Sequence, residues 1–122
     1  MAAAAQRLTF NRAQRLKQSR DFARVRQAGQ RLVHGCLIAN WTTQVAGAKT
    51  QLGVVTSGKI GNAVVRARAR RLLRETFRLH QNELAQPLKL VLVARPSIVR
   101  CGFAEVERDF LNTARKAGLL RV

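Results

Sequence analysis

Six arginines lie between residues 66 and 78, inside the segment GKIGNAVVRARARRLLRETFR at 58–78. On a helix, with about 100° between successive residues, four of them fall within an arc of roughly 120°. These four are Arg66, Arg70, Arg74 and Arg78, and Arg71 widens the arc slightly. A guanidinium group makes paired hydrogen bonds to phosphate oxygens and stacks on exposed bases. The chemistry that this spacing favours is therefore the binding of a structured RNA.

A charged helix face can also be one that only meets solvent. That alternative predicts acidic residues among the arginines, because like charges four positions apart destabilise a helix. Glu75 is the only acidic residue in the segment, so the sequence favours an anionic partner. Phe77 falls inside the arginine arc, and the pattern gives no reason for it.

The residues before this helix offer a second contact to an anion. Lys59 follows Gly58 near the expected helix N-terminus, where free backbone N–H groups attract anions. Asn62 is expected to cap the helix. Gly58 and Gly61 are equally explained as turn residues, and both interpretations stay open.

A nuclease site within the protein itself would need clustered carboxylates for two metal ions, or histidines placed as acid and base. The one acidic cluster is Glu105, Glu107 and Asp109, which suits the first turn of a helix. His34 and His80 are isolated in the sequence. We therefore predict no catalytic residue and no metal site in this chain.

The composition of the chain also indicates an anionic partner. The chain has 122 residues, enough for one domain, and 23 Lys and Arg against 6 Asp and Glu give a net charge of +17. A field of one sign indicates an anionic partner, either nucleic acid or a membrane surface. No apolar run approaches the roughly 20 residues that span a bilayer, and no secretory signal is apparent. We expect a cytoplasmic protein, with a mitochondrial transit peptide as the alternative for its basic start.

The two cysteines, Cys36 and Cys101, do not form a CxxC pair and have no histidine at zinc spacing. We expect free thiols in a reducing compartment. The sequence leaves a disulfide between them open.

The elements that must position the arginine helix follow from the pattern before it. A short helix is expected after Ser19 as N-cap, with Asp21 in its first turn and Gly29 at its end. Residues 31–45 favour strand, with a split into two strands left open. Residues 50–57 are expected to form the second strand of a hairpin, after a turn at 45–49.

After the arginine helix, which Pro87 is expected to end with fraying over 82–86, the run at 88–94 predicts a buried strand. A last helix is expected to end at Gly118. Its apolar stripe is Phe103, Val106, Phe110, Ala114 and Ala117. Residues 1–17 are expected to form a flexible basic arm. The whole order predicts a single compact α+β domain, α-β-β-(β)-α-β-α, over residues 1–122.

The segment KIGNAVVRARARRLLRETF closely resembles the signature of the bacterial ribonuclease P protein subunit, K-x-G-x-A-V-x-R-N-R-x-(K/R)-R-x-(L/I)-R. Its flanks also match. RLKQSRDFARVRQAG resembles the amino-terminal helix of that family, and LVLVARPS resembles its strand after the signature helix. The resemblance covers nearly the whole chain in the same order.

The resemblance implies a protein subunit that binds a catalytic RNA and the 5′ leader of precursor tRNA, and promotes removal of the leader. It implies that the RNA subunit performs the cleavage with Mg²⁺, and that the protein binds no cofactor of its own. One protein per RNA is expected, with a higher-order dimer left open. The implied fold has a four-stranded sheet and is ribosomal protein S5 domain 2-like. Its βαβ crossover is left-handed, whereas the pattern alone predicts a right-handed one.

Two sets of site residues follow from the resemblance. The set implied to face the RNA subunit is Lys59, Asn62, Arg66, Arg68, Arg70, Arg71 and Arg74. The set implied to line the leader cleft, between the first helix and the sheet, is Arg15, Lys17, Phe22, Arg26 and Leu37.

This sequence departs from the family pattern in three places. Ala67 replaces the central Asn of the signature, and Arg26 stands where a second Phe is common. Leu37 and Asn40 stand where the first strand often has aromatic residues. We therefore expect leader binding to depend more on charge than on stacking, and we expect Trp41 to be part of the core.

Three other functions remain as alternatives. A ribosomal-type RNA-binding protein without a processing role has the same composition. A protein-only nuclease would cleave unaided. A DNA-binding regulator would need base-reading Asn or Gln on the cationic face of its helix, where the sequence has none.

Overall fold

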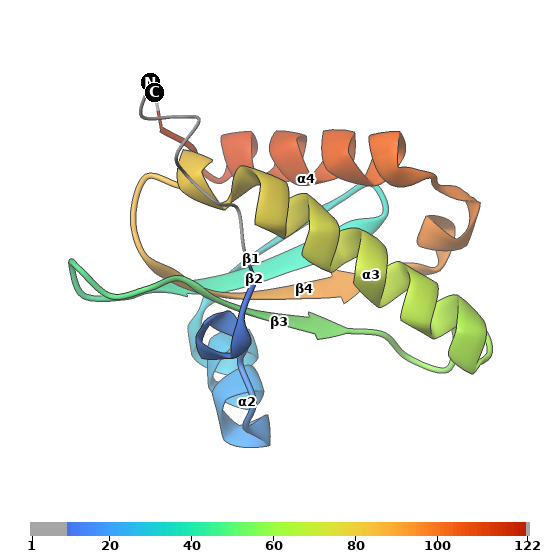
Figure 1. The fold of residues 1–122 in the computed structure, drawn as a ribbon, viewed down its shortest axis with the longest axis horizontal. Helices are drawn as coiled ribbons and strands as arrows, with labels where there is room; N and C mark the ends of the chain where they lie inside the picture. The colour runs from blue at the N-terminus through green and yellow to red at the C-terminus, as the bar shows by residue number, and fades with distance from the viewer. Residues whose placement is uncertain (1–9, 122) are drawn as a thin grey trace.

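Three α-helices and a four-stranded sheet make up residues 10–121, the part of the chain that the computed structural model describes (Figure 1). The helices are α2 (Ser19–Ala28), α3 (Ala63–His80) and α4 (Phe103–Lys116). The strands are β1 (Gln30–His34), β2 (Leu37–Thr43), β3 (Gln51–Val55) and β4 (Leu88–Ala94). Short 3₁₀ helices lie at η1 (Arg12–Gln14), η2 (Gln81–Glu83) and η3 (Pro96–Arg100).

The strands follow the order β1-β2-β4-β3. β1 and β2 form an antiparallel hairpin, so the split of residues 31–45 into two strands is confirmed. The predicted hairpin between 31–45 and 50–57 is wrong, because β4 pairs antiparallel with β2 and parallel with β3 and so lies between them. β4 is almost entirely apolar and takes a central position, where both of its edges are hydrogen-bonded and both faces are covered.

The parallel pair β3 and β4 is joined by α3, which confirms the predicted crossover unit. The α+β class and the four-stranded sheet are confirmed as well. The left hand of the crossover stays a prediction.

The sheet separates two layers of helix (Figure 1). α3 and α4 cover one face, and α2 covers part of the other. The main core lies under α3 and α4, where alternate residues of β2, among them the buried Trp41, meet α3 and α4 side chains such as Leu73 and Phe110. A smaller cluster lies under α2 around Leu16, Val25 and Val91. The prediction of Trp41 as a core residue is confirmed.

The ends of the helices mostly follow the predicted signals. Asn62 caps α3, since its Oδ1 accepts the Val65 N–H at 3.1 Å. Ser19 is the first residue of α2 rather than its cap, and the N-cap is Gln18, which makes no side-chain capping bond. α4 is followed by Gly118 in the left-handed region at φ +73°.

α3 ends at His80, before the predicted Pro87. The chain turns through η2, and Leu84 then pairs with Leu120 in an isolated antiparallel bridge. Leu84 is buried in the main core by this contact, which a continued helix would prevent.

Residues 10–17 contact the domain, which differs from the mobile arm expected over residues 1–17; residues 1–9 of that arm lie outside the described residues. The Leu16 N–H donates to the Leu52 carbonyl at 3.0 Å. The ring of Phe10 packs edge-on against Phe77 with 5.7 Å between centroids. This contact explains Phe77, which is fully buried although it falls among the arginines of α3.

Asp109 of α4 holds the turn between β1 and β2. Its Oδ2 accepts the Cys36 N–H at 3.0 Å, and Gly35, at φ +59°, lies so close that a Cβ there would be 2.2 Å from the carboxylate. Burial raises the pKa of Asp109, but the hydrogen bonds from Cys36 and Arg108 outweigh burial and lower it below its usual value. The negative carboxylate therefore stabilises the hairpin.

The two cysteines lie in different parts of the fold, Cys36 in the β1–β2 turn and Cys101 in the linker before α4. Cys36 is buried and Cys101 is half-buried, and both are free, as expected. Burial raises the pKa of the Cys36 thiol, with the Asp109 carboxylate acting in the same direction.

We expect Asp109→Asn to lower the free energy of unfolding at pH 7 by about 1–2 kcal/mol, because the amide replaces a charged hydrogen bond with a neutral one. Wild type should lose stability as the pH falls below about 4, since the unfolded carboxyl binds a proton more readily than the folded one. Asp109→Asn should lose less over this range. Urea unfolding between pH 2 and 7 measures both effects.

The matched control is Asp21→Asn on α2, where, among the described residues, the carboxylate acts only through the helix dipole, so the loss of stability should be smaller than in Asp109→Asn. An Asp109→Asn variant with the same pH dependence as wild type would contradict this role for the carboxylate.

Candidate nucleic-acid interface

The exposed side of α3 holds most of the predicted RNA-facing residues together. We call Arg66, Arg70, Arg71 and Arg74 the arginine face. Arg66 Nη1 donates to the Gly61 carbonyl at 2.7 Å, and Arg70 Nη1 donates to Thr56 Oγ1 at 2.8 Å. These bonds to the β3–α3 loop hold two guanidiniums in fixed positions while leaving other N–H groups for a ligand.

The remaining predicted residues lie at the borders of this face. Arg68 points to the other flank of α3, where its Nη2 donates to the Cys101 carbonyl at 2.7 Å. Lys59 is exposed in the loop before α3, and its backbone N–H donates to Ser57 Oγ at 3.3 Å. The side-chain oxygen of Asn62 accepts the capping hydrogen bond of α3.

An open hollow of about 350 Å³ lies beside the arginine face. Its cationic lining combines four arginines of α3 with Arg15 from the segment before α2; the four are Arg70, Arg71, Arg74 and Arg78. Burial, followed by the positive charges of Arg15 and Arg70, lowers the pKa of Arg74. The hollow thus concentrates like charges that an anion would relieve.

One acidic side chain also lines the hollow, but it is paired within its own helix. Glu75 Oε2 lies 2.6 Å from Arg78 Nη2, and the hydrogen bond from Arg78 lowers the Glu75 pKa. Ala67 lines the hollow as well, at the position where the family signature has Asn. A short side chain there leaves space that an amide would fill.

Arg15 was predicted for the leader cleft, and the structure places it against the arginine face. Its guanidinium carbon lies 5.1 Å from the centroid of the Phe10 ring, which in turn packs on Phe77. Arg15 also borders a second hollow of about 260 Å³ with Lys17, so it connects the two predicted surfaces. The spacing along the sequence cannot show this, because it depends on how residues 10–17 dock.

The second surface is the α2 face, which we define by Phe22, Asn40, Gly53 and Val91. Phe22 is half-buried over Gly53, where a Cβ would lie 2.4 Å from its Cε1. Gly53 and Asn40 both pair with Val91 on the central strand. The glycine therefore makes room for the aromatic ring against the sheet.

The other residues predicted for the leader cleft are divided. Lys17 and Arg26 are exposed at the two ends of the α2 region. Leu37 is fully buried in the main core on the opposite face of the sheet, so its placement in the cleft needs correction. Successive side chains of a strand point to opposite faces, and the next residue, Ile38, is the one that reaches the α2 side.

The acidic residues near the start of α4 have structural roles. Glu105 accepts the Gly102 N–H at 2.7 Å as a helix cap, and Asp109 is committed to the β1–β2 turn. Among residues 10–121, no three histidine, cysteine or acidic side chains come together as metal ligands.

His80 was expected to be isolated, which is wrong. Its Nε2 lies 2.7 Å from Glu107 Oε2 of α4, and its Nδ1 contacts the Glu83 carboxylate. Burial lowers the pKa of His80, but the hydrogen bonds to Glu107 and Glu83 outweigh it and raise the pKa. The pair with Glu107 joins the end of α3 to α4 across 27 residues of sequence, which spacing alone could not reveal.

No helix in the described part of the chain is long and apolar enough to cross a bilayer.

The geometry defines a class of protein, a small basic α+β domain whose cationic surface lies on one crossover helix. Comparison with known proteins makes this specific. The family model described as Ribonuclease P matches residues 10–118. The ribonuclease P protein component of Syntrophomonas wolfei is 34% identical over 105 residues, 86% of this chain and 87% of the relative. That of Alkaliphilus metalliredigens is 31% identical over 106 residues, 87% and 95% of the two chains.

Solved structures agree. The RNase P protein from Thermotoga maritima has a TM-score of 0.73 and 26% identity, covering 83% of this chain and 96% of that one. The Staphylococcus aureus RNase P protein has a TM-score of 0.80 at 21% identity, covering 90% and 100%, and supports the fold alone. The chain belongs to the ribonuclease P protein family. Membership implies a ribonuclease complex with an RNA partner.

We expect inorganic phosphate to bind the hollow at the arginine face and to raise the melting temperature. At ten times its dissociation constant, and at constant ionic strength, it should stabilise by about 1.4 kcal/mol, or roughly 3–6 °C. Arg74→Ala should reduce this rise, because it removes the guanidinium at the centre of the like-charge group. Thermal unfolding with and without phosphate measures the difference.

Arg115→Ala on α4 is the control, since it removes the same charge outside the hollow. Equal rises in wild type, Arg74→Ala and Arg115→Ala would mean a general salt effect instead of a site.

Proposed function

We propose that this protein is the protein subunit of a ribonuclease P, and that it binds the catalytic RNA subunit through the arginine face. The observation that carries the proposal is the group of guanidiniums around one hollow, from two separate segments, with its one acidic neighbour already paired. Such a group favours the phosphates of a folded RNA.

The 5′ leader of precursor tRNA would bind on the α2 face, on the other side of the sheet. Phe22 offers a half-exposed ring there, and Lys17 and Arg26 add positive charge. Stacking of one base on one aromatic ring is worth about 1–3 kcal/mol, and the flanking cations hold the backbone. Because Arg26 replaces an aromatic residue, charge carries more of the binding.

The bond-breaking chemistry would belong to the RNA subunit, and Mg²⁺ bound to that RNA would supply the activation of water and the stabilisation of the leaving oxygen. The protein would neutralise phosphates and raise the affinity for substrate, with one protein per RNA in the cytoplasm. Because binding at the phosphates releases their counterions, the affinity of the protein for RNA should fall steeply as the salt concentration rises.

Reconstitution tests the function. The purified protein should stimulate cleavage of precursor tRNA by a bacterial ribonuclease P RNA at low Mg²⁺, and should cleave nothing without that RNA. Lack of stimulation across a series of salt and Mg²⁺ concentrations would favour a ribosomal-type protein without a processing role. Cleavage without added RNA would contradict the proposal.

Variants of the two surfaces should give different defects. Arg70→Ala and Arg74→Ala should each weaken binding to the RNA subunit about three- to tenfold, and lower the slope of log affinity against log salt by about 1. Phe22→Ala should raise the Michaelis constant for precursor tRNA severalfold, with little change in affinity for the RNA subunit.

Arg115→Ala again removes a charge outside both surfaces and should change neither quantity by more than about twofold. The division into two surfaces fails if the Phe22 and arginine variants share one defect.

A further inference from the structure

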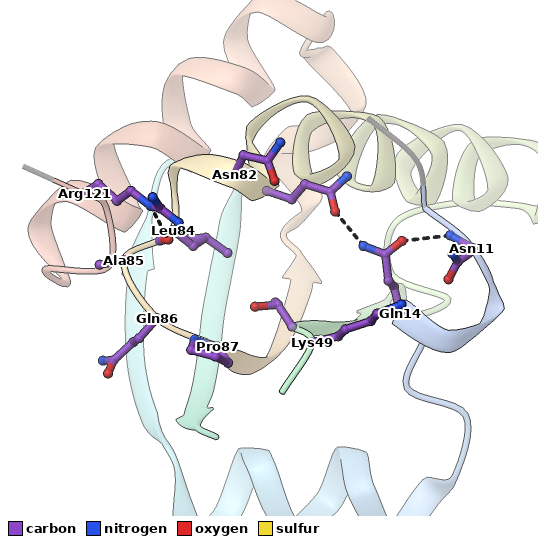
Figure 2. Close-up of a pocket in the computed structure, with 11 residues that line it drawn as sticks. Asn11, Gln14, Lys49, Asn82, Leu84, Ala85, Gln86, Pro87 and Arg121 are labelled. Carbon is purple, nitrogen blue, oxygen red and sulfur yellow. Dashed lines mark hydrogen bonds between the residues drawn. The ribbon is translucent and has the colours of Figure 1, made fainter. Parts of the chain in front are cut away.

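A third hollow, with a polar lining, lies next to the arginine face and plays no part in the function proposed above. It has a volume of about 370 Å³, within the range of small-ligand sites. Four segments meet around it: residues 11–14, the β2–β3 loop, the chain from η2 to β4, and Arg121 (Figure 2). Five carboxamide side chains line it, those of Asn11, Gln14, Gln81, Asn82 and Gln86.

Part of this lining is held in place by hydrogen bonds. Gln14 Oε1 accepts the Asn11 N–H at 3.0 Å, and Gln14 Nε2 donates to Gln81 Oε1, as Figure 2 shows. Gln81 Nε2 in turn donates to the Arg78 carbonyl at 3.0 Å. The wall formed by η1 and the end of α3 is therefore ordered before any ligand arrives.

Other polar groups of the lining have hydrogen-bond donors or acceptors that a ligand could use. Asn11 uses its Oδ1 to accept the Ala13 N–H at 3.1 Å, which leaves the Nδ2 donors. Within residues 10–121, the Gln86 carboxamide and the Lys49 ammonium make no hydrogen bond. The Nε–H of Arg121 donates to the Leu84 carbonyl at 3.1 Å, which leaves the two Nη groups of the guanidinium to donate to a ligand.

The lining chemistry matches a nucleotide. A carboxamide offers a donor and an acceptor side by side, which is the pattern on the edge of a nucleobase and most closely that of adenine. Lys49 and Arg121 supply positive charge for a phosphate, and the half-buried Pro87 supplies an apolar surface for a base. No acidic side chain is among the residues that line the hollow.

The hollow also continues the surface assigned to RNA. Phe10 and Arg15 line the arginine hollow, while Asn11 and Gln14, between them in the chain, line this one. A strand that runs along α3 toward its C-terminal end would reach the carboxamides directly after the arginines.

We infer that this hollow binds a single unstacked nucleotide of the RNA partner, with its base on the carboxamides and its phosphate on Lys49 and Arg121. The inference rests on the proposed function, since it takes RNA as the partner. The hollow would add contacts to a base beside the arginine face, which offers mainly positive charge. Sequence recognition of RNA commonly uses such unstacked bases.

The double variant Asn11→Ser, Gln86→Leu tests the inference. Ser is as good a helix cap as Asn, so the first change removes the amide donors and keeps the cap, and Gln86 is exposed. Affinity for a bacterial ribonuclease P RNA should fall about tenfold, while the slope of log affinity against log salt stays that of wild type. Gln27→Leu, an exposed carboxamide on α2, is the matched control and should bind as wild type does.

Two results of this experiment would overturn the inference. Wild-type affinity in the double variant, with Arg74→Ala still impaired, would leave the proposed function standing without the nucleotide site. A loss accompanied by a lower salt slope would mean a phosphate contact only. The proposed function itself fails separately, if neither the arginine variants nor the double variant alters binding.

A titration of the wild-type protein avoids any effect of substitution on folding. The side-chain amide NMR signals of Asn11, Gln14 and Gln86 should shift more with adenosine, which carries no charge, than with inorganic phosphate, which the inference places on Lys49 and Arg121. The inference is wrong if adenosine leaves these signals in place, or if phosphate alone moves them equally.

Discussion

Repulsion between guanidiniums on α3 is the constraint on which the rest of the structure depends. Arg70 and Arg74 are half-buried beside Arg15, and burial, followed by the positive charges of Arg15 and Arg70, lowers the pKa of Arg74. The core beneath offsets this repulsion, because the other side of the helix buries Leu73 and Thr76 completely. A fold that holds like charges together in this way is preorganised for a polyanion, because the repulsion is relieved only when that partner binds.

Local patterns in the sequence predicted the elements that carry this helix. Asn62 as cap, the run at 88–94 as a buried strand and the arginine spacing each depend on residues a few positions apart, and each is confirmed. The strand order could not be predicted in this way. The apolar run at 88–94 fits beside either neighbour, and only the complete sheet shows that it separates β2 from β3.

The site was predictable to the same extent. The grouping of arginines on one helix follows from periodicity. The contribution of Arg15 depends instead on the contact between Phe10 and Phe77, which lie far apart in the sequence. The pairing of His80 with Glu107 likewise joins elements distant in sequence. Leu37 was placed on the wrong face because a strand reverses its faces with a shift of one residue, and the resemblance did not fix that register.

The most direct test of the account is the salt dependence of the wild-type protein's affinity for a bacterial ribonuclease P RNA. If the arginine face meets phosphates, log affinity should fall linearly with log salt, with a slope of about −3 or steeper, as expected when several phosphates are neutralised. A slope near zero, with affinity unchanged by salt, would contradict the central claim.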